Sequence, residues 1–200
     1  MPHAIFVETG LDGGATVAAY AAELPGCATF AASAEEASGE MPRRVGRFVD
    51  WLRASGEEAP TFLGDNWYEV ERAATGATRA AFSLDDLPPG VDELRRYLSW
   101  LELAREALAD AVDAASSGAV AAAGPRLAAI EAQDRLLAVQ LGAEPVEPTG
   151  SPIDRLYAAR DALTTALKSA GPAGDGVRRA IRLAIADDLR LAERLRSAGG

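Results

Sequence analysis

Only two side chains in the sequence belong to the types that most often act as a base or a nucleophile near neutral pH. His3 is the single histidine and Cys27 the single cysteine among the 200 residues. A cysteine becomes an effective nucleophile when a base or a second cysteine lowers its pKa. His3 lies near the start of the chain with no nucleophile motif beside it, and Cys27 has no C-x-x-C partner. We therefore expect Cys27 to be a buried structural thiol and predict no catalytic residue.

Aspartates on two predicted helices are the other residues whose spacing could support chemistry. Asp134 lies on one helix, and Asp187 and Asp188 lie on the last helix, where they could face Asp134 across a bundle. Carboxylates alone can hold Mg²⁺ or Ca²⁺. The alternative is that these aspartates face solvent or pair with arginines such as Arg135 and Arg190. We favour this alternative and predict no metal site.

The sequence contains none of the glycine-rich motifs that hold phosphates or build a nucleophile elbow. It has no P-loop, no G-x-G-x-x-G after a strand and no G-x-S-x-G. The run Asp12-Gly13-Gly14 tolerates positive φ and predicts a hairpin turn. We therefore predict no cofactor, and the sequence favours a protein that is not an enzyme.

The net charge of −10 is concentrated in the first part of the chain. Residues 1–78 hold 12 acidic and 5 basic side chains. An acidic surface repels phosphate backbones, so binding of nucleic acid would need a local basic patch. The basic cluster of this region has helical spacing, and we interpret it as a solvated helix face: Arg43, Arg44, Arg47 and Arg53. We predict no nucleic-acid partner.

The chain also shows no signal for a membrane. No segment approaches about 18 consecutive apolar residues, the length that a spanning helix needs. The start, MPHAIFVETG, has neither a basic leader nor a small-residue cleavage site. A lone cysteine cannot form an internal disulfide. We expect a cytoplasmic protein.

The first part of the chain predicts a small sheet with a helix. Alternating apolar runs predict an antiparallel meander of three strands, at residues 3–8, 16–22 and 27–32. Ser33, followed three residues later by Glu36, is typical of a helix start. Pro42 either kinks this helix or begins a second one. Segments 61–63 and 67–70 complete a β-β-β-α-β order.

The rest of the chain predicts an all-α unit. Apolar residues recur every three or four positions in four segments, at about 91–115, 125–141, 153–169 and 177–197. Loops rich in proline and glycine separate these segments. Four amphipathic helices of this kind form a four-helix bundle. We therefore predict an α+β protein with a sheet domain at 1–78 and a bundle at 79–200.

One motif in the first domain resembles the signature of HicB-like domains. ELPGCATFAASAEEA (Glu23 to Ala37) has the L-P-G-C turn, the short strand and the helix that opens with E-E-A, and VGRFVDWLRASGE (Val45 to Glu57) is similar to the helix end. The similarity covers about residues 3–73. It implies a domain that pairs with itself, hence a homodimer, and that can act as an antitoxin blocking a small RNA-cleaving partner. The DNA-binding appendage common in that family is replaced here by the helical domain.

The second domain resembles the DinB-like bundle over about residues 80–197. LAAIEAQDRLLAVQLG (Leu127 to Gly142) is similar to the second helix of that family, and VRRAIRLAIADDLRLAERL (Val177 to Leu195) to its last. Active members hold a divalent metal with histidines on these two helices. The corresponding positions here fall around Ala129, Ile185 and Leu189, which cannot coordinate a metal. The resemblance implies a bundle without the metal of the family.

Three hypotheses for function follow. The first is a non-enzymatic binding or interaction protein, homodimeric, with a HicB-like association domain and a metal-free DinB-like bundle. The second is a DinB-like metal- or thiol-dependent transferase or hydrolase that works through carboxylates such as Asp134 and Asp188. The third is a HicB-type antitoxin for a small basic ribonuclease, since an acidic domain suits a basic partner.

Overall fold

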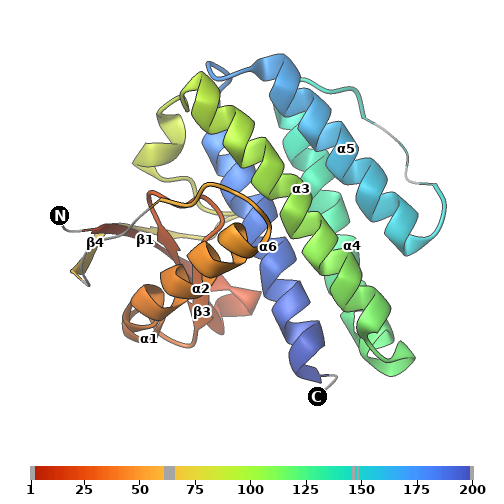
Figure 1. Ribbon diagram of the computed structural model, residues 1–200, viewed down its shortest axis with the longest axis horizontal. Helices are drawn as coiled ribbons and strands as arrows, with labels where there is room; N and C mark the ends of the chain where they lie inside the picture. Colours follow the sequence, from red (N-terminus) through yellow and green to blue (C-terminus); the bar gives the residue numbers. More distant parts are fainter. Residues whose placement is uncertain (1–2, 61–65, 146, 148, 199–200) are drawn as a thin grey trace. The chain divides into compact units, whose positions relative to one another are not determined.

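A computed structural model describes residues 3–60, 66–145, 147 and 149–198 of the chain (Figure 1). The chain divides into two compact units, one from Met1 to Leu87 and one from Pro88 to Gly200. The first is a small mixed sheet with helices, and the second consists of four long helices, which confirms the predicted α+β class. The predicted boundary between residues 78 and 79 falls inside the first unit, because residues 75–87 pack against the sheet.

The sheet has the strand order β3-β2-β1-β4. Its strands are β1 His3–Leu11, β2 Thr16–Ala21, β3 Ala28–Ala31 and β4 Trp67–Ala74. The first three pair antiparallel, as the predicted meander requires, and β4 pairs parallel with β1. The parallel pairing follows from the helical crossover between β3 and β4. The predicted segment 61–63 lies outside the described residues.

Two tight turns connect the meander. The first contains the short 3-10 turn η1 Asp12–Gly14, in which Gly13 and Gly14 have positive φ. The second is the Pro25-Gly26 turn, where Gly26 has φ 88° and the amide of Cys27 donates to the Leu24 carbonyl at 2.9 Å. Cys27 is fully buried, in agreement with a structural thiol.

Two helices cover one face of the sheet. They are α1 Ala34–Gly39 and α2 Met41–Ala54. Ser33 caps α1, since its Oγ accepts from the amide of Glu36 at 3.2 Å. Pro42 lies in the first turn of α2, so it begins a second helix. On the covered face, Thr29 Oγ1 donates to the carbonyl of Ala37 at 2.6 Å.

The opposite face is covered by residues 75–87, which we call the strap and which end in the short 3-10 turn η2 Ser83–Asp86. The ring of Phe82 stacks on Phe6 at 5.1 Å. Glu8, on β1, is completely buried and binds the strap. Its carboxylate accepts from Thr75 Oγ1 at 2.8 Å, from Arg79 Nε at 3.0 Å and from the amide of Ala80 at 2.7 Å.

The second unit is the predicted four-helix bundle. Its helices are α3 Val91–Ala114, α4 Ser117–Gln140, α5 Pro152–Ala170 and α6 Val177–Ala198. In this bundle α3 packs along α6 and α4 packs along α5, while α4 also contacts α6 (Figure 1). Within the described parts of the chain, none of the helices is both long enough and apolar enough to cross a membrane.

Helix α4 begins eight residues before the predicted start at Pro125, which lies inside the helix. Two local features explain the difference. Ser116 caps the helix by accepting from the amide of Ala119 at 3.3 Å. The residues that follow are rich in alanine, the strongest helix former, and this outweighs the proline.

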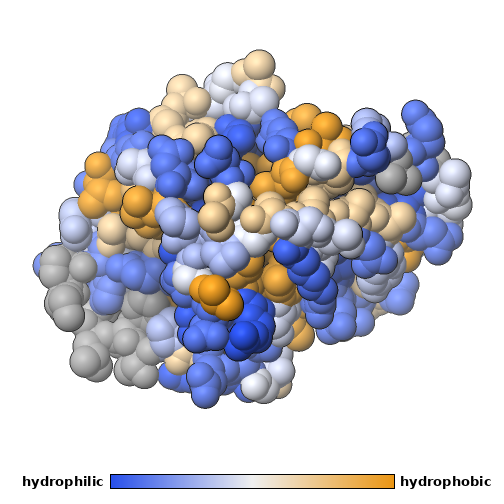
Figure 2. All heavy atoms as spheres, turned by 90° about the horizontal axis from the view of Figure 1, so that it is seen from above, coloured by the Kyte–Doolittle hydropathy of each residue, from blue (hydrophilic) through white to orange (hydrophobic). Residues whose placement is uncertain are grey.

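Figure 2 shows that apolar side chains interrupt the charged surface of the face in view. Large apolar side chains that are exposed, among the described residues, lie on β4, around the end of the strap, and on α3, α4 and α5: Tyr68, Val70, Leu87, Val91, Leu136, Val139 and Tyr157.

The Glu8 contacts predict a pH-dependent contribution to stability. Burial tends to raise the pKa of Glu8, but the bonds from Arg79, Ala80 and Tyr20 outweigh it and hold the pKa below its ordinary value of 4.5. A carboxyl with a lowered pKa stabilises the fold above the unfolded pKa, and this contribution is lost as the pH falls through the folded pKa.

We therefore expect Glu8→Gln to lower the free energy of unfolding by about 2 kcal/mol at pH 7 and to flatten its decline below about pH 4.5. Urea unfolding between pH 7 and pH 3 measures both effects. The exposed Glu58→Gln is the matched control. A pH profile shared by the wild type and Glu8→Gln would contradict the assignment.

Candidate functional site

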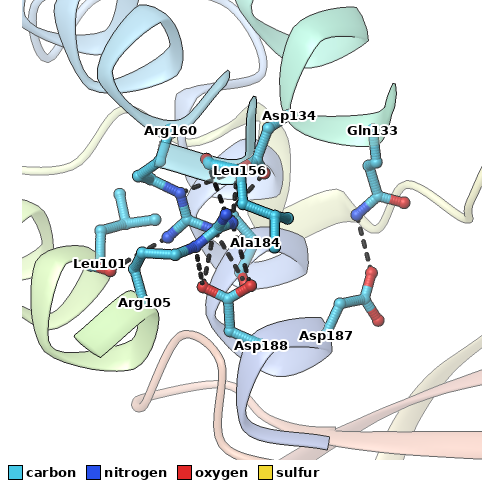
Figure 3. A network of polar contacts seen from close by, with 9 residues as sticks. All are labelled: Leu101, Arg105, Gln133, Asp134, Leu156, Arg160, Ala184, Asp187 and Asp188. Atoms are coloured by element: carbon cyan, nitrogen blue, oxygen red, sulfur yellow. Dashed lines mark hydrogen bonds and ion pairs between the residues drawn. The ribbon is translucent and has the colours of Figure 1, made fainter. Parts of the chain in front are cut away.

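Four charged side chains meet in the interior of the bundle, one from each helix. They are Arg105 on α3, Asp134 on α4, Arg160 on α5 and Asp188 on α6 (Figure 3). Each side chain is at most 3 % exposed. We call this group the tetrad. Burying charge is costly unless it is paired and hydrogen-bonded, so the geometry of the tetrad decides what it can do.

Arg105 binds both aspartates. Its Nη2 donates to Asp134 Oδ2 at 2.8 Å, and its Nε donates to Asp188 Oδ2 at 3.1 Å. Its Nη1 donates to the carbonyl of Leu156 on α5 at 2.8 Å. The guanidinium thus links α3 to each of the other three helices.

Arg160 repeats this arrangement from the other side. Its Nε donates to Asp134 Oδ2 at 2.9 Å, its Nη2 lies 2.9 Å from Asp188 Oδ2, and its Nη1 donates to the carbonyl of Leu101 on α3 at 3.0 Å. Each arginine therefore contacts both carboxylates, and the two positive and two negative charges balance. A balanced group of this kind keeps its charges buried without a counter-ion from outside.

The pKa directions reflect this competition between burial and pairing. Burial disfavours the charged form of Arg160, but Asp134 and Asp188 outweigh it, so the pKa of Arg160 is raised. Burial also raises the pKa of Asp188, and the attraction of Arg160 and Arg105 opposes that rise. All four groups are committed to one another, which leaves no carboxylate in the tetrad available as a metal ligand or a general base.

The tetrad has a pseudo-two-fold arrangement that is visible in the sequence. LELAREALADAVDAA (101–115) on α3 and LYAARDALTTALKSA (156–170) on α5 share the pattern L-x-x-A-R-[ED]-A-L. Each arginine donates to the carbonyl of the leucine that begins the other copy of the pattern. The packing has the same symmetry, since exchanging α3 with α5 and α4 with α6 converts the α3–α6 contact into the α4–α5 contact.

The structure brings two of the predicted site residues together. Asp134 and Asp188 do face each other across the bundle, and they pair with arginines, as the favoured alternative states. The arginines that they bind are Arg105 and Arg160, whereas Arg135 lies 3.4 Å from Glu131. The other alternative, that these two aspartates face solvent, is wrong, because both are buried. Arg105 and Arg160 were not predicted as site residues, although the L-x-x-A-R repeat marks both of them in the sequence.

The other candidates are not members of the tetrad. Asp187 accepts from Gln133 Nε2 at 2.7 Å, outside the group of four (Figure 3). His3 lies on β1, with its ring 4.6 Å from that of Trp67 and its Nδ1 3.6 Å from Glu23. Cys27 is buried in its turn.

The positions that the DinB-like resemblance assigns to metal ligands do not share one surface. Ala129 is exposed, while Ile185 and Leu189 are buried. Among the residues that the structure describes, no group of three or more histidine, cysteine, aspartate or glutamate side chains is placed to hold a metal ion.

No family model, curated protein or solved structure matches this chain. What is established is a small mixed-sheet unit followed by a four-helix bundle. The resemblances to HicB-like and DinB-like domains rest on the sequence motifs alone.

We expect replacement of one tetrad residue and replacement of all four to have different effects on the free energy of unfolding. Asp134→Ala leaves two buried guanidiniums with one carboxylate, and we expect it to lower the free energy of unfolding by about 3–5 kcal/mol. Replacing all four residues by Met, Leu, Met and Leu, in chain order, should leave stability near or above that of the wild type. Urea unfolding followed by circular dichroism measures both variants.

Asp187→Ala is the matched control, because this neighbouring carboxylate lies outside the tetrad, and we expect a loss below about 1 kcal/mol. If Asp134→Ala cost no more than this control, the tetrad would not be the interaction that holds the bundle together.

Proposed function

We propose that this chain is a non-enzymatic binding protein whose sheet unit contacts another protein through β4. The observation that carries the proposal is the position of β4 at the edge of the sheet, with Tyr68 and Val70 exposed by 46 % and 44 %. An edge strand offers a row of backbone donors and acceptors to an added strand. Exposed aromatic and aliphatic side chains beside such an edge supply the contact area.

The two edges of the sheet are unequal. The opposite edge, β3, has only four residues, whereas β4 has eight. The pairing of β4 with β1 shifts register between Glu69 and Glu71, which places Val70 at a bulge. Glu69 and Arg72 pair with each other along the strand at 2.6 Å, and charged side chains of this kind limit indiscriminate strand pairing. We infer that β4 pairs only with strands of a partner whose side chains match its bulge and its charged residues.

Charge defines the class of that partner. Residues 1–78 are strongly acidic, and β4 itself carries two glutamates, of which Glu69 is paired with Arg72 and Glu71 adds the remaining negative charge. An extended segment with alternating basic and apolar side chains would match both the charge and the exposed side chains of the edge. The resemblance to HicB-like domains, which bind a small protein, supports the same class of partner.

The tetrad supports this proposal over the carboxylate enzyme. A DinB-like transferase or hydrolase that uses Asp134 and Asp188 would need these carboxylates to reach a metal or a substrate. Both are buried, and both are bound by two guanidiniums. The oxygens of both carboxylates bind the two guanidiniums, and these contacts join the four helices.

A defined peptide tests the proposal. We expect a ten-residue peptide of alternating lysine and valine to bind the full chain with a Kd below about 1 mM and to slow hydrogen exchange of the backbone amides of β4. Replacing both exposed side chains, Tyr68→Glu and Val70→Glu, should weaken binding at least about tenfold.

Two controls make the result specific. A peptide of alternating glutamate and valine should not bind, and Leu136→Glu on the bundle should bind the basic peptide as the wild type does. Equal binding of both peptides, or binding that the β4 variant leaves unchanged, would refute the proposed edge.

A further inference from the structure

The sequence repeat of the bundle extends from the arginine helices to the aspartate helices. AQDRLLAVQLG (132–142), at the end of α4, and ADDLRLAERLR (186–196), on α6, share the pattern A-x-D-x-x-L-A-x-x-L over their first ten residues. Together with the pattern that α3 and α5 share, this relates α3 and α4 to α5 and α6 as two copies of one helix pair. Corresponding positions of the two copies can therefore be compared directly.

The two copies differ at the last position of the pattern. Arg196 on α6 reaches across to α3, where its Nη2 donates to the carbonyl of Ala107 at 3.0 Å. The counterparts of these two residues are Gly142 and Ala162 of α5. Gly142 follows the end of α4 at Gln140 and has φ 93°. It has no side chain, so the α4–α5 contact lacks the guanidinium that the α3–α6 contact contains.

A hollow lies at the corresponding place, where α4 packs along α5 (Figure 1). Ala138 and Ala162 line it, and they are the counterparts of Ala192 and Ala107. Its volume of about 280 Å³ has room for about nine atoms of the size of a water molecule. The other apolar residues of its wall are Ala132, Leu136, Val139 and Pro145. The hollow thus has the size and the apolar wall that suit a short alkyl chain.

The charged side chains that line the hollow are mainly acidic. Glu144 and Glu147 contribute two carboxylates, and Arg135 contributes one guanidinium. Arg135 pairs with Glu131, whose Oε1 lies 3.4 Å from its Nη2. Neither Glu144 nor Glu147 has an ion-pair partner in the part of the chain that the structure describes. The unpaired charge at the hollow is therefore negative and favours a cation.

We propose that this hollow binds an alkylguanidinium group, the chemical counterpart of the Arg196 side chain. The alkyl chain lies against Leu136 and Val139, and the guanidinium bonds the carbonyl of Ala162 and the carboxylates of Glu144 and Glu147. A guanidinium suits such a set of acceptors, because its fork of donors can bond a carbonyl and a carboxylate together. Both arginines of the tetrad do this within the same bundle.

Titration with butylguanidinium, followed by amide NMR of the full chain, tests the proposal. We expect saturable shifts at the amides of Val139, Gly142 and Ala162, with a Kd between about 1 and 10 mM for so small a ligand. Butylammonium has the same chain and charge but lacks the planar fork, and it should bind at least about threefold more weakly. Absence of saturation by about 50 mM, or equal binding of butylammonium, would overturn the guanidinium site.

Butyrate tests the competing ligand, an anion. It would bind Arg135, whose buried Nε has no hydrogen-bond partner among the described residues. We expect butyrate to cause no saturable shift at the same amides, because the two unpaired carboxylates repel it. Butyrate binding as tightly as butylguanidinium would overturn the predicted charge of the ligand.

Variants of the hollow test its position. Ala162→Leu fills the hollow and should weaken binding of butylguanidinium at least about tenfold. Ala158→Leu is the matched control, since it adds the same side chain at an exposed position of α5 outside the wall of the hollow. Glu144→Gln combined with Glu147→Gln should weaken binding at least about threefold, with an unchanged circular dichroism spectrum. Equal binding by Ala162→Leu and Ala158→Leu would contradict the proposed position, and wild-type affinity in the glutamine variant would contradict the role of the carboxylates.

A capped arginine, N-acetyl-arginine methylamide, distinguishes the two sources of the group. Binding as tight as that of butylguanidinium assigns the hollow to an arginine side chain of a partner, and exclusion of the capped arginine alone assigns it to a free small molecule. Binding of neither compound would overturn the proposal. The Tyr68→Glu and Val70→Glu variant of β4 should bind butylguanidinium as the wild type does, so this site and the β4 edge can fail independently.

Discussion

The bundle depends on a balance of buried charge. Arg105 and Arg160 would each be costly in an apolar interior, and so would Asp134 and Asp188. Their cost is offset only because each guanidinium reaches both carboxylates and a backbone carbonyl of a neighbouring helix. This requirement determines which helices lie next to one another and in which register. The apolar stripes alone would permit several pairings of similar helices, so the tetrad supplies the specificity that the stripes lack.

The sheet unit also contains a buried charge that is stabilised by hydrogen bonds from a neighbouring segment. Glu8 is a buried carboxylate on a central strand, and it binds side chains and the backbone of the strap. In both units the groups best suited to chemistry are occupied by structural bonds. On the surface of the first unit, by contrast, the edge strand β4 leaves Tyr68 and Val70 exposed.

Periodicity and turn chemistry were sufficient to predict most of the fold. Three local features of the sequence agree with the folded structure: the Asp12-Gly13-Gly14 turn, the Ser33 cap and the apolar spacing of the four helices. In natural proteins such local preferences are generally consistent with the overall fold. Two features were not predictable in this way. The early start of α4 reflects a competition between a capped alanine-rich segment and Pro125. The tetrad reverses the rule that charged residues face solvent, so only the L-x-x-A-R repeat within the sequence could have indicated it.

The tetrad also constrains the order in which the bundle can form during synthesis. Asp188 is on the last helix, so a nascent chain that has released only α3, α4 and α5 carries two arginines and one aspartate toward the future core. That set is unbalanced, and closing it would bury an uncompensated positive charge. We expect the first three helices to stay loosely associated at the ribosome. The bundle would then close in one cooperative step once α6 has emerged.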